Sequence, residues 1–417
     1  MYTGKKISIN DFVSAISETA DLVSPVFKRH QKEVAYVSYR IAREMRLPED
    51  EIRDIVLASL LHDIGAFSIG ERIKIHTFQP HELEIKEHAY TGYKLLKNFA
   101  PFANAAGMVK FHHTGYDESE YDVPVGAYII HLADRLCILV NENREILAQI
   151  PEIMEKISQT RNEFHPDTFD VMNSLAGMEC FWIEAFSLFY SERILKTVSY
   201  SKEIAGLQTL RDFAKLISQM IDFRSRYTAT HSSGVAAVAA ELAAISGCSE
   251  NECSLMEIAG YMHDLGKLAV SNNILEKNGK LNMEEFSVVR KHTYYTYAIL
   301  SNINGLEDLA VWAAYHHEKL DGSGYPFHVT EDDFPLQARV MAVADIITAL
   351  MEDRPYRPGM TEENAAGILL NMAKNKLIDK SIVDMASSHF SHINNVREKA
   401  QQEEKDQYSS FNEDNLV

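Results

Sequence analysis

The chain contains two ordered sets of histidines and aspartates that keep nearly the same spacing. The first set comprises His30, His62, Asp63, His88, His112, His113 and Asp134. The second set comprises His231, His263, Asp264, His292, His316, His317 and Asp345. They include ten of the 17 histidines, and neutral imidazole is the commonest protein ligand for metals. Two aligned sets are hard to attribute to chance, so we predict an internal duplication built around metal chemistry.

The second set carries five imidazoles and two carboxylates, which suit first-row divalent metals. A single histidine on an apolar helix face is usually a core residue, so the metal interpretation rests on the whole set. Seven ligands exceed one tetrahedral ion but fit two ions that share a carboxylate, and Asp264 is the natural bridge after His263. The side chains of His316 and His317 would point about 100° apart on a helix, so both can bind only at a helix terminus or across a groove.

The surrounding sequence predicts helices. Apolar residues in 235–245 recur at helical spacing before Gly247, and 52–65 and 255–266 are expected to be helices that end at a glycine. Strand signals are scarce, and the glycine-rich stretch 321–329 is expected to be a loop. We therefore predict an all-α chain made of two tandem helical bundles related by duplication.

The duplication also divides the chain. We expect a first bundle at 20–195 and a second at 207–400, joined by a connecting segment at 196–206. A short lead at 1–19 precedes them, and a polar, disordered tail at 401–417 follows.

Composition excludes several classes of protein. The chain has 417 residues, 46% apolar and 24% charged, which is typical of globular domains and not of disordered or fibrous chains. It has no apolar run long enough for a membrane helix, and its start lacks the apolar region of a secretory signal. Four scattered cysteines do not make a disulfide framework, so we expect a cytoplasmic protein.

Charge limits the partners. The 41 basic and 60 acidic residues give a formal net charge of −19, which opposes binding to DNA or to anionic lipid. A phosphorylated ligand would need metal ions or local cations, for which Lys267, Lys319, Arg354 and Arg357 are the candidates. For Lys319 and Arg357, an ordinary solvated surface position is an equal alternative.

The second copy resembles the HD-GYP family, a subgroup of the HD-domain metal phosphohydrolases. Four segments carry the resemblance: RYTATHSSGV (226–235), YMHDLGKLAV (261–270), HHEKLDGSGYP (316–326) and ADIITALMEDRPYRPGM (344–360). The GYP stretch is highly specific, whereas an HD pair alone is a weak signal. The first copy resembles a divergent HD domain.

This resemblance implies a bacterial signalling enzyme that hydrolyses cyclic dinucleotides. All seven residues of the second set match the family's metal ligands, usually iron or manganese. Lys267 matches a lysine that contacts the scissile phosphate, and Tyr325, Arg354 and Arg357 match positions that contact the dinucleotide. In members with a third metal, a glutamate stands where this chain has Tyr227, so we expect two ions; Asp222 is interpreted as structural.

We therefore expect hydrolysis of cyclic di-GMP to linear pGpG, and onward to GMP, by a hydroxide that bridges the metals. Asp264 and Lys267 are the expected catalytic residues. The alternatives are a hydrolase specific for cyclic GMP–AMP, a nucleotide phosphohydrolase, and a non-catalytic cyclic dinucleotide receptor. The sequence does not determine the metal identity or the oligomeric state, for which a homodimer is one open arrangement.

The first copy keeps all seven ligand types but lacks the substrate residues. Ala66 stands where Lys267 stands, HHTGYDESEYDVP (112–124) replaces the GYP stretch, and Asn143 replaces an arginine. Three interpretations follow: a regulatory module that binds metal or a small ligand, which we favour, a hydrolase for another phosphate ester, or a structural bundle.

Overall fold

The computed structural model describes residues 7–23, 29–66, 82–117, 122–187, 203–204, 206–223, 229–277, 279–353 and 358–413. The chain forms two compact units, Ser8–Lys202 and Glu203–Val417, the latter joined by Met1–Ile7. In the described residues, two-residue strands β1 (Ile7–Ser8) and β2 (Glu203–Ile204) form the only sheet, and helices make up most of the rest. The predicted all-α fold is confirmed.

The described α-helices of the N-terminal unit have 7 to 15 residues, and two 3-10 helices of three residues lie between them. They are α1 (Ile9–Val23), α2 (His30–Glu44), α3 (Glu49–Leu61), α5 (Glu82–Leu96), η2 (Ala100–Phe102), α6 (Ala103–Phe111), α7 (Val125–Ile138), α8 (Ile146–Gln159), η3 (Arg161–Glu163), α9 (Pro166–Ala176) and α10 (Glu179–Ala185).

The C-terminal unit repeats this pattern and adds a long final helix. Its helices are α12 (Leu207–Asp222), α13 (His231–Ile245), α14 (Glu250–Met262), η4 (Leu265–Ala269), α15 (Asn272–Leu275), α16 (Met283–Ser301), α17 (Glu307–Ala314), η5 (Tyr315–His317), η6 (Glu331–Asp333), α18 (Leu336–Met351), α19 (Glu362–Lys374), α20 (Lys380–Ser388) and α21 (Phe390–Glu413).

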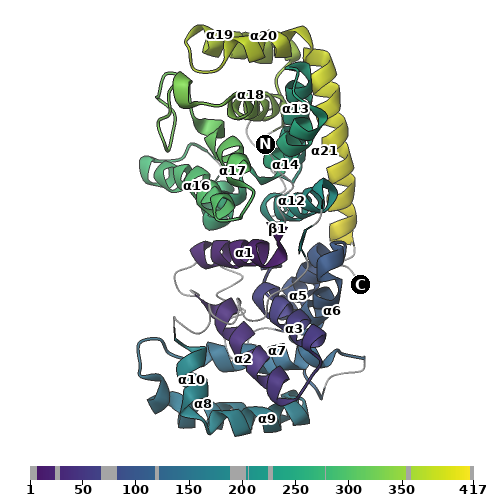
Figure 1. The fold of residues 1–417 in the computed structure, drawn as a ribbon, viewed down its shortest axis with the longest axis vertical. Coiled ribbons are helices and arrows are strands. Elements are labelled where there is room, and N and C mark those ends of the chain that lie inside the picture. The colour runs from purple at the N-terminus through teal and green to yellow at the C-terminus, as the bar shows by residue number, and fades with distance from the viewer. Residues whose placement is uncertain are drawn as a thin grey trace. The chain divides into compact units, whose positions relative to one another are not determined.

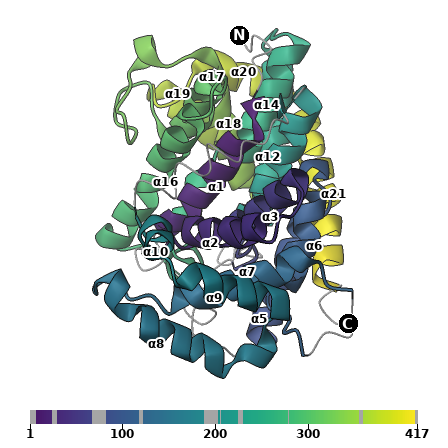
Figure 2. The ribbon, with the colours of Figure 1, turned by 60° about the horizontal axis from the view of Figure 1, so that its bottom comes forward.

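The duplication is visible in the order and packing of these helices. In sequence order, α2, α3, α5, α6 and α7 correspond to α13, α14, α16, α17 and α18. Helix α2 packs against α3 and α7, and α13 packs in the same way against α14 and α18 (Figures 1 and 2). Each bundle therefore brings the same helix ends toward one interior point.

Small residues let the central pair of the C-terminal unit approach closely. Helix α13 reads HSSGVAAVAAELAAI, and its Ala236 lies against Gly260 of α14. A Cβ atom added to Gly260 would lie 2.5 Å from the Cα atom of Ala236. This close approach brings the start of α13 near the end of α14.

The chain ends differ from the sequence expectations. Residues 9–19 of the expected lead belong to α1, which packs on α2 and α3. The expectation of a disordered tail is wrong for residues 401–413, which extend α21, the long helix that packs on α13 (Figure 1). The tail has polar composition, but Glu404 is buried and accepts a hydrogen bond from Gln219 at 3.0 Å, and the ring of Tyr408 contacts Phe223.

The two HD pairs lie just past the ends of their helices, one turn earlier than the predicted glycine stops. Helix α14 ends at Met262, and Asp264 leads into the 3-10 helix η4. The backbone of η4 is then held to α16, because Thr296 accepts from Gly266 N at 2.9 Å and donates to His263 O at 3.0 Å. A Cβ atom on Gly266 would lie 1.9 Å from the carbonyl oxygen of His292, so this position requires glycine.

We predict that Gly266→Ala destabilises the C-terminal unit by about 1–3 kcal/mol or more, because the added methyl group must push η4 away from α16. The matched control is Gly367→Ala in α19, where an added Cβ meets nothing within 4 Å. That change should be neutral or stabilise by up to about 1 kcal/mol. Urea denaturation of both variants measures the difference, and equal midpoints would contradict the close approach.

Candidate two-metal centre

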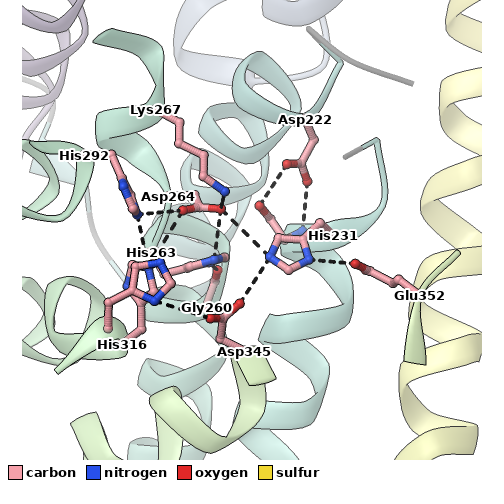
Figure 3. A network of polar contacts seen from close by, with 12 residues as sticks. Asp222, His231, Gly260, His263, Asp264, Lys267, His292, His316, Asp345 and Glu352 are labelled. Atoms are coloured by element: carbon pink, nitrogen blue, oxygen red, sulfur yellow. Dashed lines mark hydrogen bonds and ion pairs between the residues drawn. The ribbon is translucent and has the colours of Figure 1, made fainter. Parts of the chain in front are cut away.

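Helix ends position the ligand set of the C-terminal unit (Figure 3). His231 is the first residue of α13, and the His263–Asp264 pair follows the last residue of α14. His316 and His317 form the short helix η5 directly after α17, the kind of helix terminus that their adjacency requires. The two remaining ligands, His292 and Asp345, project from within α16 and α18.

The structure brings the predicted ligands into two adjacent groups. Ligand atoms of His231, His263 and Asp264 lie within 4.8 Å of one another, and so do those of His292, His316 and His317. Asp345 lies beside both groups, 3.4 Å from His231 Nε2 and 3.9 Å from His317 Nδ1.

Asp264 lies between the two groups and faces each with a different oxygen. Its Oδ2 atom is 3.1 Å from His263 Nε2 and 3.9 Å from His231 Nε2. Its Oδ1 atom is 3.3 Å from His292 Nε2 and 3.9 Å from His316 Nε2. This is the arrangement expected of a carboxylate that bridges two metal ions.

The ring orientations favour metal binding through Nε2. The Nδ1 atoms of three histidines lie 2.6 to 2.7 Å from the backbone carbonyl three residues earlier, which serves as the acceptor for His263, His292 and His316. A proton on Nδ1 leaves the lone pair on Nε2, which points into the cluster. His263 Nε2 and Asp264 Oδ1 are buried and make no hydrogen bond within the described residues.

Buried polar atoms without partners are rare in native proteins, and here they are an imidazole nitrogen and a carboxylate oxygen, which suit divalent first-row metals. Two ions bound between the groups would complete the contacts of these atoms. The residues present therefore fit a pair of divalent metals.

Electrostatics point the same way for Asp264, His292 and His316, whereas the carboxylates of Glu352 and Asp345 outweigh burial and raise the pKa of His231 to about 10. Burial alone would raise the pKa of Asp264, but the charges of His263 and Lys267 outweigh it and hold that pKa well below its usual range. Burial is the largest cause that lowers the pKa of His292 to about 3, and it also holds the pKa of His316 well below its usual range. At neutral pH Asp264 is thus a carboxylate and His292 and His316 are neutral imidazoles, which are the states that bind metals.

Lys267 lies at the edge of the centre. It belongs to η4, and its Nζ atom donates to Asp264 Oδ2 at 2.5 Å. Burial lowers the pKa of the lysine, but the charge of Asp264 outweighs burial and raises it. An ammonium group is thus held beside the carboxylate that lies between the two imidazole groups.

Tyr325 of the GYP stretch also reaches the centre. Its ring centroid lies 5.0 Å from that of His317, and the guanidinium of Arg290 lies 4.8 Å from the tyrosine ring. The loop is held by Glu318, a buried carboxylate that accepts from Phe327 N at 2.7 Å and from Val329 N at 3.3 Å. The predicted contact residues Arg354 and Arg357, and also Tyr227, lie outside the described residues.

Two acidic residues lie near His231, and only one of them, Asp222, was given a role from the sequence. Asp222 accepts from the backbone N and the hydroxyl of Ser232, at 2.9 and 3.1 Å, so it holds the start of α13, as its structural interpretation expected. Glu352 was not singled out, yet its Oε2 atom lies 3.0 Å from His231 Nδ1. The available signal was its position seven residues, or two helical turns, after Asp345.

The N-terminal unit assembles its own set in the same way. One group contains His30, His62 and Asp134, and the other contains Asp63, His88, His112 and His113. Asp63 again lies between them, with Oδ2 3.3 Å from His62 Nε2 and Oδ1 3.4 Å from His88 Nε2.

The cation beside this second centre is different. Ala66 takes the place of the lysine, and the buried guanidinium of Arg135 instead donates to Asp134 Oδ2 at 2.6 Å. Arg135 Nη2 also lies 3.5 Å from His113 Nδ1. One carboxylate oxygen of Asp134 thus faces His30 at 3.0 Å while the other is held by arginine.

We predict that Asp264→Ala removes metal from the C-terminal centre. Loss of a residue that only orients a ligand already costs about 10–100-fold in metal affinity, so loss of the shared ligand should cost more. Elemental analysis of the purified full chain measures this loss. Asp332→Ala, an exposed carboxylate of the same unit, is the control, and full metal content in Asp264→Ala would refute the bridging role.

Comparison with known proteins agrees with this geometry. Residues 215–382 and 27–139 each match an HD domain family. The chain therefore carries two HD domains in tandem.

Three named relatives are similar to part or nearly all of the chain. The chain is 27% identical over 397 residues to 3′3′-cGAMP-specific phosphodiesterase 1 of Vibrio cholerae, covering 91% of both chains. It is 41% identical over 151 residues to 3′3′-cGAMP-specific phosphodiesterase 3 of that organism, 36% of this chain and 33% of the relative. It is 35% identical over 176 residues to the cyclic di-GMP phosphodiesterase response regulator RpfG of Xanthomonas campestris, 42% of this chain and 46% of the relative.

A solved structure shares the fold. The crystal structure of a cyclic GMP-AMP specific phosphodiesterase of V. cholerae, V-cGAP3, matches with a TM-score of 0.63 and 20% sequence identity, covering 93% of this chain and 98% of that one.

In the described residues no helix combines the length and apolar character needed to cross a membrane.

Proposed function

We propose that the C-terminal HD domain is a cyclic dinucleotide phosphodiesterase that works at a two-metal centre. The observation that carries the proposal is Asp264, whose two oxygens face two separate imidazole groups at 3.1 and 3.3 Å. The proposed metal ligands are the five histidines and two aspartates of the C-terminal set, and iron or manganese is the proposed metal. Bound there, the ions supply Lewis-acid activation of water and neutralise phosphate charge.

The chain's own residues supply the rest of the chemistry. Lys267 holds a positive charge beside Asp264, where it can stabilise the negative charge that develops on the phosphate in the transition state. Tyr325 packs against the metal-ligand candidate His317 and is proposed to contact the dinucleotide, together with Arg354 and Arg357. The acidic surface leaves these cations as the local attraction for a phosphodiester.

Two substrates are supported by different relatives. Cyclic di-GMP, opened to linear pGpG and then to GMP, is supported by the similarity to RpfG. Cyclic GMP–AMP is supported by the relative that matches along nearly the whole chain. A receptor without turnover is the less favoured interpretation, since all seven ligand residues and Lys267 are retained. A cytoplasmic location and a homodimer stay predictions.

The test is turnover by the metal-loaded full chain on cyclic di-GMP, 3′3′-cyclic GMP–AMP and a panel of mononucleotides. We expect a linear dinucleotide from at least one cyclic substrate, and the ratio of the two kcat/KM values assigns the preference. Binding of a cyclic dinucleotide without turnover would favour the receptor, and cleavage of mononucleotides alone would favour a nucleotide phosphohydrolase.

We predict that Lys267→Ala lowers kcat by about 100- to 1,000-fold while the metal content stays unchanged, because removing one transition-state charge partner has this size of effect. Lys374→Ala, an exposed lysine at the end of α19, is the control. An unchanged kcat in Lys267→Ala would remove the lysine from the mechanism.

We also propose that the N-terminal HD domain binds metal and regulates the C-terminal one. Its seven candidate ligands form the same two groups around Asp63. Ala66 and the changed loop leave this unit without the counterparts of Lys267 and the GYP stretch, so we do not assign it the same substrate. Hydrolysis of another phosphate ester and a purely structural role are the alternatives.

We predict that Asp63→Ala lowers the total metal content by up to two ions per chain and leaves the C-terminal ions bound. Asp264→Ala is the reciprocal comparison, so the two variants together assign each ion to a domain. Elemental analysis at a fixed free metal concentration measures the metal content of both variants. An unchanged metal content in Asp63→Ala would favour the structural role.

A further inference from the structure

His231 differs from three of the other candidate ligand histidines in what fixes its ring. The Nδ1 atoms of His263, His292 and His316 each lie near the backbone carbonyl three residues earlier in the sequence. His231 is the first residue of α13, so no earlier residue of this helix can supply such a carbonyl. Among the described residues, a side chain from another part of the chain lies beside its ring.

A carboxylate takes that place. Glu352, just past the end of α18, has its Oε2 atom 3.0 Å from His231 Nδ1 (Figure 3). An Nδ1–H that donates to this carboxylate leaves the lone pair on Nε2, which lies 3.4 Å from Asp345 Oδ1 and 3.9 Å from Asp264 Oδ2. A carboxylate acceptor also makes the imidazole a stronger metal ligand than a neutral carbonyl does.

The C-terminal helix holds this carboxylate. Gln401 of α21 donates to Glu352 Oε1 and, at 3.2 Å, to the carbonyl of Thr230, the residue before His231. Arg397, one turn earlier and buried, donates in turn to Gln401 Oε1. The chain of contacts therefore runs from α21 through Glu352 to a metal-ligand candidate.

The sequence position that corresponds to Glu352 carries no carboxylate in the N-terminal unit. The residue seven positions after Asp134 is Asn141, whose backbone exchanges hydrogen bonds with Gln149 at 2.9 and 3.1 Å. A glutamate at this position is thus particular to the C-terminal copy of the repeat.

We propose that Glu352 is a positioning residue that fixes His231 for metal binding, and that Gln401 on the C-terminal helix keeps Glu352 in place. Occupancy of one ion of the pair then depends on the docking of α21 along α13. This inference rests on the metal centre of the proposed function. It adds that metal binding at this centre depends on α21, the last helix of the chain.

The alternative is that Glu352 only ties the end of α18 to the start of α13. A purely structural tie would change the stability of the unit but not the relative affinity of the two ions. Metal affinity and thermal stability therefore have to be measured on the same variants.

The experiment titrates Mn²⁺ against a competing chelator in the full chain carrying Asp63→Ala, so that the ions counted belong to the C-terminal centre. Glu352→Gln keeps one acceptor oxygen but loses the charge, and Glu352→Ala loses both. We expect the affinity for one ion to fall by about 10-fold in the first and about 100-fold in the second, with the other ion nearly unchanged. Gln401→Leu, which leaves the glutamate in place, should give a smaller loss at the same ion.

The control is Glu362→Gln. Glu362 also bonds to α21, accepting from Ser391 at 2.7 Å and from Asn394 at 3.3 Å, but it is not part of the ligand cluster. The Glu362→Gln variant should change the melting temperature without changing the affinity for either metal ion. If Asp63→Ala proves unfolded, the same variants are compared by difference in the wild-type background.

Retention of both ions within about threefold of wild type in a folded Glu352→Ala would overturn the proposal. Equal weakening of both ions, in step with the melting temperature, would assign Glu352 the structural tie instead. Because the readout is metal and not turnover, a chain that cleaves no cyclic dinucleotide would overturn the proposed function while leaving this inference testable.

Discussion

The C-terminal domain depends on one buried carboxylate that must face two groups of imidazoles at once. Asp264 is 2% exposed, and a buried carboxylate is costly unless positive or hydrogen-bonding groups surround it. Its two oxygens face histidines from four different helices or turns, and Lys267 donates to one of these oxygens. The helix ends, the tight turn at Gly266 and the clamp by Thr296 all keep this carboxylate in place.

Helix termini are the means by which the bundle concentrates so many ligands. A histidine within a helix can anchor its ring on the carbonyl of the turn before it, and three of the ligands do so. A histidine that begins a helix has no such turn, and Glu352 supplies the missing acceptor for His231. The long helix α21 thereby becomes part of the environment of the site, although none of the candidate ligands lies on it.

The duplication preserves the metal geometry more strictly than the groups around it. Asp63 and Asp264 occupy the same position between two imidazole groups, with closest contacts between 3.1 and 3.4 Å in both units. The neighbouring cation has moved from a lysine after the HD pair to Arg135, which follows the last aspartate. Two centres with the same ligands are thus placed beside different charges, which is a physical basis for different roles.

The sequence by itself determined the helical class, the duplication and all fourteen ligand candidates, because metal coordination requires particular side chains and a repeat displays them twice in the same order. The adjacency of His316 and His317 even required the helix terminus that η5 provides. Only the tertiary structure decided that residues 401–413 extend a helix and that Glu352 and Gln401 support His231. These contacts join residues 49 and 121 positions apart, and neither composition nor periodicity records a partner at such a distance.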